Sequence, residues 1–201
     1  MLHYEFGTEI VNPQPFFDLN RKYFGSYTGS DLMDFRRRLE TTKGGIGCAY
    51  YDKAPASVLQ TMRFSSGGNN DDIPRTSDKL TGGETYENYD IRGNTVVFVT
   101  FVVERTLRHM NIDGSNLTDT ALERFLSNYN NAEFRITYTP AIKHAVKMHL
   151  RHGAKPVIRL PKARPGLVIE DVPAEDVIVM GYKWPRYNLS LLNDFDISGS
   201  S

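Results

Sequence analysis

The sequence predicts an α+β fold: a mixed, largely antiparallel sheet with about three helices and extended N- and C-terminal arms. Segments with the two-residue alternation of strands and segments with the helical period follow one another in mixed order, and strands outnumber helices. The chain has 201 residues, of which 40% are apolar, which is enough for one ordinary domain with a buried core. We therefore expect a single domain over residues 30–183, between the two arms.

Residues 1–29 are predicted to be an extended N-terminal arm. Pro13 and Pro15 disfavour helix at the residues that precede them, and Gly25 and Gly29 interrupt any regular pattern. Aromatic side chains are scattered along this stretch, and leaving them exposed would cost roughly 25 cal/mol per Å² of apolar surface. The arm must therefore cover a surface, either its own domain or a neighbouring subunit. Its predicted anchors are Phe6, Phe16, Phe17, Tyr23 and Phe24.

The first part of the domain is predicted to contain one helix and two strands. Ser30 is a typical N-cap, and Gly44 with Gly45 would end the helix, which indicates a helix at about 31–43. Alternating apolar residues then predict strands at 46–51 and 57–64.

A long acidic segment follows these strands. Residues 65–93 carry six Asp or Glu against three Lys or Arg, and Gly, Asn and Ser are frequent at the start of the segment. A stretch of this length without periodicity inside a small domain is usually functional or disordered. We predict a flexible acidic loop here.

The second part of the domain begins with the strongest strand of the chain. Residues 95–108 are apolar on both faces at their start, which indicates a central strand covered on both sides. Thr118 is expected to cap a helix whose buried stripe includes Leu122 and Phe125. Pro140 suits the first position of a helix that runs to about His152. Further strands are predicted at 134–138, 157–160, 167–169 and 177–182.

Residues 184–201 are predicted to be a second, C-terminal arm. Apolar side chains occur here without a clean period, and the last four residues are Ser and Gly-rich. As at the other end, these side chains need a surface to cover. The predicted anchors are Trp184, Tyr187 and Leu191.

Composition excludes several classes of protein. Twenty-four basic residues balance twenty-four acidic ones, which argues against a protein that coats DNA by bulk charge. No apolar run approaches the roughly 18 residues of a membrane helix, and residues 1–29 lack the pattern of a secretory signal. A single cysteine, Cys48, excludes an internal disulfide framework. We expect no membrane association, and a cytoplasmic or virion location.

Positive charge is nevertheless concentrated in one region. No Asp or Glu occurs between Phe134 and Ile169, whereas basic residues recur along a predicted helix and the strand after it. This basic patch suits nucleic acid or an acidic face of a partner, and it equally suits a solvated helix balanced by acids within the same chain. Its members are Lys143, Lys147, Arg151, Lys155 and Arg159.

Residue patterns typical of catalysis are weak. His149 and His152 have the spacing of two metal ligands on a helix, but no third ligand is arranged near them, and a core histidine with one hydrogen bond is favoured. The glycines before Cys48 do not match a phosphate-binding loop, and a buried small residue explains this cysteine better than a nucleophile does. We therefore predict no catalytic residue, no metal site and no cofactor.

The function predicted from the sequence is that of a non-enzymatic structural subunit. It would oligomerise through its arms and its oppositely charged faces, either with copies of itself or with other subunits of a larger assembly. A component of a virus or phage virion, in the shell, neck or tail, is the narrower form of this prediction. The alternative is a nucleic-acid-binding module that uses the basic segment 135–164.

Overall fold

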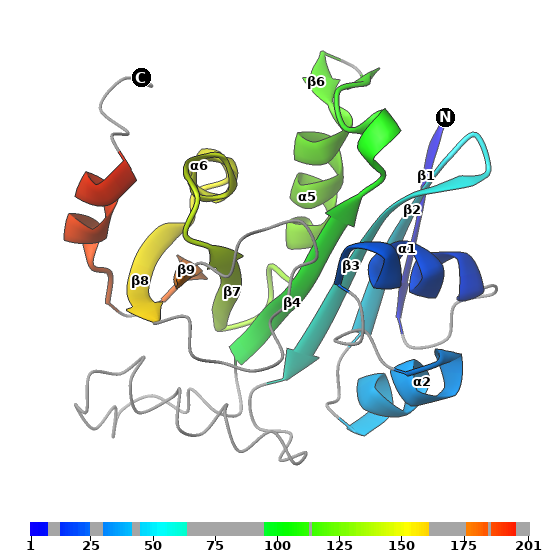
Figure 1. The fold of residues 1–201 in the computed structure, drawn as a ribbon, viewed down its shortest axis with the longest axis horizontal. Coiled ribbons are helices and arrows are strands. Elements are labelled where there is room, and N and C mark those ends of the chain that lie inside the picture. The colour runs from blue at the N-terminus through cyan, green and yellow to red at the C-terminus, as the bar shows by residue number, and fades with distance from the viewer. Residues whose placement is uncertain are drawn as a thin grey trace. The chain divides into compact units, whose positions relative to one another are not determined.

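The fold was analysed in a computed structural model, which confirms the α+β class and the mixed, largely antiparallel sheet (Figure 1). Seven strands form the sheet in the order β1-β2-β3-β4-β7-β9-β8, and β5 and β6 form a separate hairpin. The pairings β1–β2, β2–β3, β7–β9 and β8–β9 are antiparallel. The structure describes residues 1–7, 13–24, 30–41, 45–63, 95–112, 114–160, 176–184 and 186–195.

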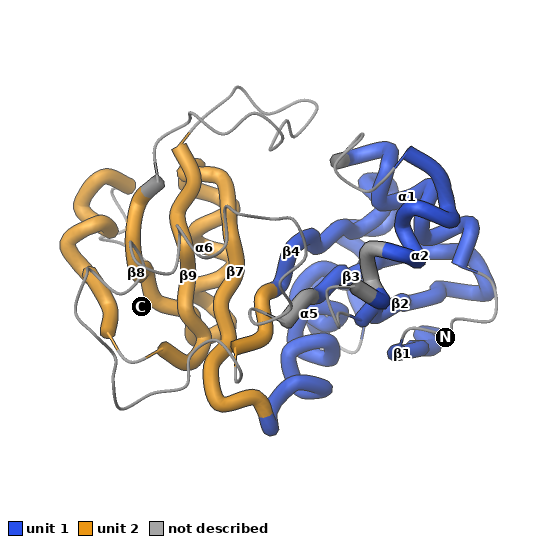
Figure 2. The backbone as a smooth tube through the Cα atoms, turned by 90° about the horizontal axis from the view of Figure 1, so that it is seen from below, with its two compact units in different colours: residues 1–62, 98–131, 165–173 blue, residues 63–97, 132–164, 174–201 orange. Residues whose placement is uncertain are grey.

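The chain forms two compact units (Figure 2). Unit 1 contains residues 1–62, 98–131 and 165–173, and unit 2 contains residues 63–97, 132–164 and 174–201. Residues 30–183, which the sequence predicts to form a single domain, are thus shared between the two units. Each unit combines segments that are far apart in the sequence. None of the helices among the described residues is long and apolar enough to span a membrane.

Unit 1 is a sheet with helices on both faces. One face of its strands packs against α1 and α2, where Phe16, Phe35 and Val58 belong to one buried cluster. The other face packs against α5, whose Phe125 makes edge-on ring contacts with Phe6 and Phe101. The elements are β1 (Leu2–Gly7), α1 (Gln14–Phe24), α2 (Leu32–Thr41), β2 (Gly45–Tyr51), β3 (Ala54–Arg63), β4 (Thr95–Val103), η2 (Arg105–Leu107), β5 (Asn111–Ile112), β6 (Ser115–Asn116) and α5 (Leu117–Ser127). Residues 95–97 of β4 lie in unit 2.

The N-terminal region differs from the predicted extended arm. Leu2–Gly7 pairs with β2 as an edge strand, and Gln14–Phe24 is a helix that contributes Phe16 and Phe17 to the core. Pro15 lies in the first turn of this helix, where its missing N–H is not needed, so the proline begins the helix rather than preventing it. Phe16 is fully buried, and it stabilises unit 1 itself.

In unit 2, a helix and the C-terminal segment pack against three strands. Its core contains Val146, Ile178, Met180 and Phe195. Trp184 is also buried, and its ring packs edge-on against Phe134. The predicted C-terminal arm therefore covers its own unit at Trp184 and Phe195, because apolar side chains are available there to bury them. The elements are β7 (Phe134–Pro140), α6 (Lys143–Arg151), β8 (Lys155–Leu160), β9 (Val177–Lys183) and η3 (Leu189–Phe195).

Several helix and strand boundaries depart from the sequence prediction. Asp31 Oδ1 accepts the Asp34 N–H and so caps α2 in place of Ser30, and Asn116 caps α5 in place of Thr118. Pro140 ends β7 instead of beginning α6. The strand expected over 95–108 ends at Val103. The predicted loop 65–93 and the predicted strand 167–169 lie outside the described residues.

Candidate functional site

Helix α1 presents polar side chains to the sheet of unit 1. Asn20 and Tyr23 are three residues apart and share the helix face of Phe16, which is the face that packs on β3 and β4. Asn20 is fully buried, although an amide side chain carries two donors and one strong acceptor. Two groups of polar residues in and beside this helix form the candidate site.

The first group, which we name the buried polar cluster, consists of Asn20, Gln60 and Thr100. The Nδ2 atom of Asn20 donates to Oε1 of Gln60 at 3.4 Å, near the long end of the hydrogen-bond range. Oδ1 of Asn20 and Oγ1 of Thr100 are buried and have no hydrogen-bond partner in the part of the chain that the structure describes. Exposure of these residues is low throughout, at 0% for Asn20, 8% for Gln60 and 3% for Thr100.

Two members of this cluster lie on the neighbouring strands β3 and β4. The Glu104 N–H donates to the Ala56 carbonyl at 2.8 Å, which sets the register between the two neighbouring strands. In a regular antiparallel ladder, four residues further along β3 and four back along β4 bring Gln60 opposite Thr100. The buried contacts agree, because the intervening Val58 and Val102 belong to one core cluster.

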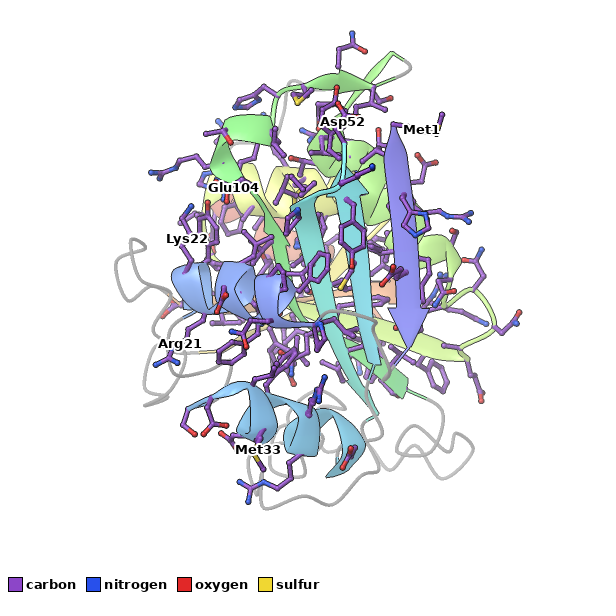
Figure 3. All side chains as sticks on the ribbon, turned by 90° about the vertical axis from the view of Figure 1, so that its right-hand side faces the viewer. Met1, Arg21, Lys22, Met33, Asp52 and Glu104 are labelled. Carbon is purple, nitrogen blue, oxygen red and sulfur yellow. The ribbon has the colours of Figure 1, made fainter. Side chains whose placement is uncertain are left out.

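The second group, the surface ionic cluster, consists of Lys22, Tyr23, Glu104 and Arg108. Figure 3 shows Lys22 and Glu104 close together at the end of α1. The ammonium of Lys22 lies 3.2 Å from both carboxylate oxygens of Glu104, and hydrogen bonding and charge from Glu104 raise the Lys22 pKa. The Tyr23 hydroxyl donates to the same carboxylate at 3.5 Å and accepts the Arg105 N–H at 3.2 Å. The Arg108 guanidinium lies 5.5 Å from the centre of the Tyr23 ring.

The connection from β4 to α5 is rich in basic groups. Arg105, Arg108 and His109 follow the strand directly. The Arg108 Nε donates to the Val103 carbonyl, which holds this side chain at the end of β4. At the start of α5, the Asp119 N–H is bonded to the Asn116 side chain. An anion at this connection would therefore be bound mainly by side chains, because part of the helix terminus is already occupied.

Unit 2 contains a buried histidine that is paired within the protein. Nδ1 of His149 lies 2.5 Å from the Tyr182 hydroxyl. Burial, with a smaller effect of His152, lowers the pKa of His149 to about 3, and burial raises the pKa of Tyr182. His149 is therefore neutral at physiological pH, and the prediction of a core histidine with one hydrogen bond is confirmed.

Cys48 lies in the core of unit 1, on strand β2. Cys48 is fully buried, and burial together with the charge of Glu5 raises its pKa, which disfavours a nucleophilic thiolate. Within the described ranges, no three His, Cys, Asp or Glu side chains gather in a way that could hold a metal ion.

The basic patch lies on α6 and β8 of unit 2. Arg159 is paired with Asp176 at 2.7 Å and with Asp194 at 2.6 Å, so acids of the same unit balance its charge. Lys155 lies over the Tyr187 ring at 5.4 Å. The three patch residues on α6 also interact with other groups of the chain, through hydrogen bonds, ring contacts or charge. They are Lys143, Lys147 and Arg151. The predicted association into oligomers or with other subunits stays a prediction.

The remaining predicted anchors lie in different environments. Phe6 packs on Phe125, Tyr23 joins the surface ionic cluster, and Leu191 is half-buried in η3. Sequence reasoning missed Asn20, Gln60, Thr100 and Glu104. A usable signal was present in α1, because Phe16, Leu19 and Tyr23 have helical spacing and Asn20 lies on the same stripe.

Comparison with known proteins identifies the fold. No family model matches the chain, and no curated protein matches it. Solved structures match over nearly the whole chain. An acetyltransferase from Bacillus subtilis, in complex with CoA, has a TM-score of 0.58 and 14% sequence identity, with 92% of this chain and 99% of that chain covered.

Two further structures give the same result. An agmatine N-acetyltransferase has a TM-score of 0.58 and 11% identity over 90% of this chain and 98% of that one. The ribosomal-protein-S18-alanine N-acetyltransferase from Escherichia coli has a TM-score of 0.56 and 10% identity over 94% and 99%. This chain therefore has the fold of these acetyltransferases.

This likeness overturns the function predicted from the sequence. The prediction of a non-enzymatic assembly subunit is wrong, and so are its narrower form, a virion component, and its alternative, a nucleic-acid-binding module. The N-terminal region explains the difference, because Phe16 and Phe17 of α1 are buried in the core of unit 1 itself.

Proposed function

We propose that this chain is an N-acyltransferase, which moves an acyl group from a CoA thioester to an amine. The observation that carries the proposal is the extent of the fold likeness: about nine-tenths of this chain matches nearly the full length of several acetyltransferases. Fold alone does not define an activity. The proposal therefore also needs groups that suit an amine and groups that suit a CoA thioester.

The surface ionic cluster suits the amine. Glu104 already binds a primary ammonium ion, that of Lys22, through both carboxylate oxygens. An acceptor amine is also an ammonium ion at neutral pH, and it must lose a proton before it can attack. A carboxylate at the end of β4 attracts such a cation and can accept a proton as the reaction proceeds.

The proposed transfer of the acyl group to the amine is a nucleophilic acyl substitution. The neutral nitrogen attacks the thioester carbonyl carbon, a C–N bond forms and the C–S bond breaks. The leaving thiolate takes up a proton, and the nitrogen gives up a proton as the amide forms. The protein therefore has to hold the amine, remove protons from it and orient the thioester.

The connection between β4 and α5 suits the phosphates of CoA. Arg105, Arg108 and His109 supply positive or protonatable groups within five residues. Arginine binds phosphate oxygens through its planar fork of donors, and Arg108 is held in place by the Val103 carbonyl and the Tyr23 ring. When bound, a CoA thioester would supply the activated acyl group.

Calorimetry with CoA tests this proposal. We expect CoA to bind the wild-type chain and to bind Arg108→Ala about tenfold more weakly, since a charge-assisted bond is lost. Arg37→Ala is the matched control, because Arg37 is an exposed arginine on α2 that pairs with Asp34, and its CoA affinity should be unchanged.

Thiol release completes the test. Acetyl-CoA and propylamine should produce free CoA thiol and N-propylacetamide in equal amounts with the wild-type chain. Absence of both CoA binding and amide formation with a panel of alkylamines would refute the proposed function.

A further inference from the structure

Buried polar groups without partners are costly, and unit 1 places two of them on adjoining elements. A buried acceptor or hydroxyl that lacks a hydrogen bond loses its hydration without compensation, and folded proteins contain few such groups. Asn20 Oδ1 and Thr100 Oγ1 are both of this kind among the residues described. Gln60 bonds to Asn20, and a regular ladder continued from the bond between Glu104 and Ala56 would place it opposite Thr100.

Other unpartnered atoms do not form such a group. The Tyr4 hydroxyl lies in aromatic packing with Phe6 and Phe125, and the Trp184 indole packs on Phe134. Each is a single atom at an aromatic contact. Among the described residues, only the buried polar cluster combines two unpartnered oxygens with a further polar side chain, that of Gln60.

We infer that the buried polar cluster binds the nitrogen of the acceptor amine, with Asn20 Oδ1 and Thr100 Oγ1 accepting its N–H bonds. This inference rests on the proposed N-acyltransferase function and deepens it, because it selects the form of amine that the site holds. All three side chains of the cluster are uncharged, and burial penalises an ammonium ion far more than a neutral amine. The cluster therefore favours the neutral amine, which is the nucleophilic form.

The two clusters then have separate tasks. The surface ionic cluster attracts the ammonium ion and accepts a proton at Glu104, and the buried polar cluster holds the resulting neutral amine. Entry to the buried polar cluster requires a side chain to move. Gln60 is its most exposed member, and its 3.4 Å bond to Asn20 is weak enough to be replaced by a bond from the ligand.

Two threonines on neighbouring strands provide a matched test. Thr100 is 3% exposed and its hydroxyl has no described partner, whereas Thr61 is 2% exposed and its hydroxyl bonds to Gly45 and lies 3.2 Å from the Tyr129 hydroxyl. Thr100→Val and Thr61→Val remove the same atom from each. We expect Thr100→Val and Asn20→Leu to raise the KM for propylamine about tenfold while CoA affinity stays the same. Thr61→Val should leave that KM unchanged.

A binding measurement that does not depend on turnover separates this inference from the proposed function. Propylamine is titrated into the full chain carrying ¹³C-labelled threonine methyl groups, at a pH where part of the amine is neutral. We expect the Thr100 methyl signal to shift at saturating propylamine and the Thr61 signal to remain in place. If the Thr100 methyl signal shifts but the chain forms no amide, the binding site is supported and the proposed reaction is refuted.

Two results would contradict the binding of propylamine by the buried polar cluster. If the Thr100 signal does not respond to propylamine, or if Thr100→Val leaves the KM of an active chain unchanged, the inference is wrong.

Discussion

The buried polar groups on the two faces of strand β3 differ in their hydrogen bonding. On the face toward α5, the Thr61 hydroxyl bonds to both backbone groups of Gly45 and lies 3.2 Å from the Tyr129 hydroxyl. On the face toward α1, the next polar residue, Gln60, bonds to an asparagine whose own carbonyl oxygen lacks a partner among the described residues. Successive residues of a strand point to opposite faces, so one strand supports both arrangements.

The difference distinguishes groups that stabilise the fold from groups that are kept for a ligand. A satisfied buried network contributes to stability, whereas unpartnered groups reduce it and are retained only if something else benefits. Among the buried polar groups, we therefore assign a folding role to Thr61 on the α5 face and a binding role to Asn20 and Thr100 on the α1 face. The following predictions test this division, starting with the largest effect.

Phe16→Ala should give the largest loss of stability. Phe16 is fully buried on the inner face of α1, and removing an aromatic ring from a core costs about 3–5 kcal/mol. Urea unfolding at equilibrium measures the change. Met33→Ala on α2 is the control, because Met33 is 82% exposed and should cost less than about 0.5 kcal/mol. Equal, small effects would mean that α1 is not part of the core.

Thr61→Val should lower the free energy of unfolding by about 1–3 kcal/mol, because it leaves buried groups of Gly45 without their partner. Thr100→Val has nearly the same shape change but removes a hydroxyl that lacks a described partner. It should leave stability unchanged or raise it. Parallel urea titrations of the two variants measure the contrast, and equal losses would remove the basis for separating the two faces.

The pH dependence of stability tests the satisfied pair in unit 2. Burial lowers the pKa of His149 to about 3, below its ordinary value of about 6.5, so the unfolded chain binds more protons between these values. This contribution to stability is complete above pH 6.5 and is lost as the pH falls toward 3, by at most about 1.4 kcal/mol per pH unit. Urea unfolding from pH 7 to pH 4 should show a steeper loss for wild type than for His149→Gln. Equal slopes would contradict a buried neutral histidine.

Lys22→Gln should have the smallest effect on stability. The ion pair with Glu104 is exposed on the lysine side, and pairs of this kind contribute little. The thermal midpoint should therefore hardly change. The KM for propylamine should fall, since the ammonium of Lys22 no longer competes for Glu104. A rise in KM would mean that Lys22 helps to bind the acceptor instead.

Much of the fold could be predicted from local pattern. Strands β2, β3 and β4 and helices α2, α5 and α6 lie where apolar alternation, helical period and glycine stops place them. Helix α1 is the main departure, because Pro13 and Pro15 predict an extended chain whereas Gln14–Phe24 is helical. Proline is tolerated in the first helical turn, and the stripe of Phe16, Leu19 and Tyr23 was the stronger signal.

The candidate site could not be predicted, because it depends on pairing between distant segments. Asn20, Gln60 and Thr100 are separated by 40 residues at each step, and nothing local relates them. In the sequence, Thr100 only interrupts an apolar strand, and Asn20 is a single polar residue in an aromatic stretch. The packing of α1 and the register of β3 with β4 give these residues a common location.

Ligand-induced stabilisation tests the central claim most directly. Thermal unfolding of wild type and Thr100→Val is measured with and without saturating propylamine, at a pH where part of the amine is neutral. A ligand that binds only the folded state raises the midpoint. We predict a rise for wild type and a much smaller rise for Thr100→Val. An equal rise in both proteins, or none in wild type, would contradict a role for the buried polar cluster in amine binding.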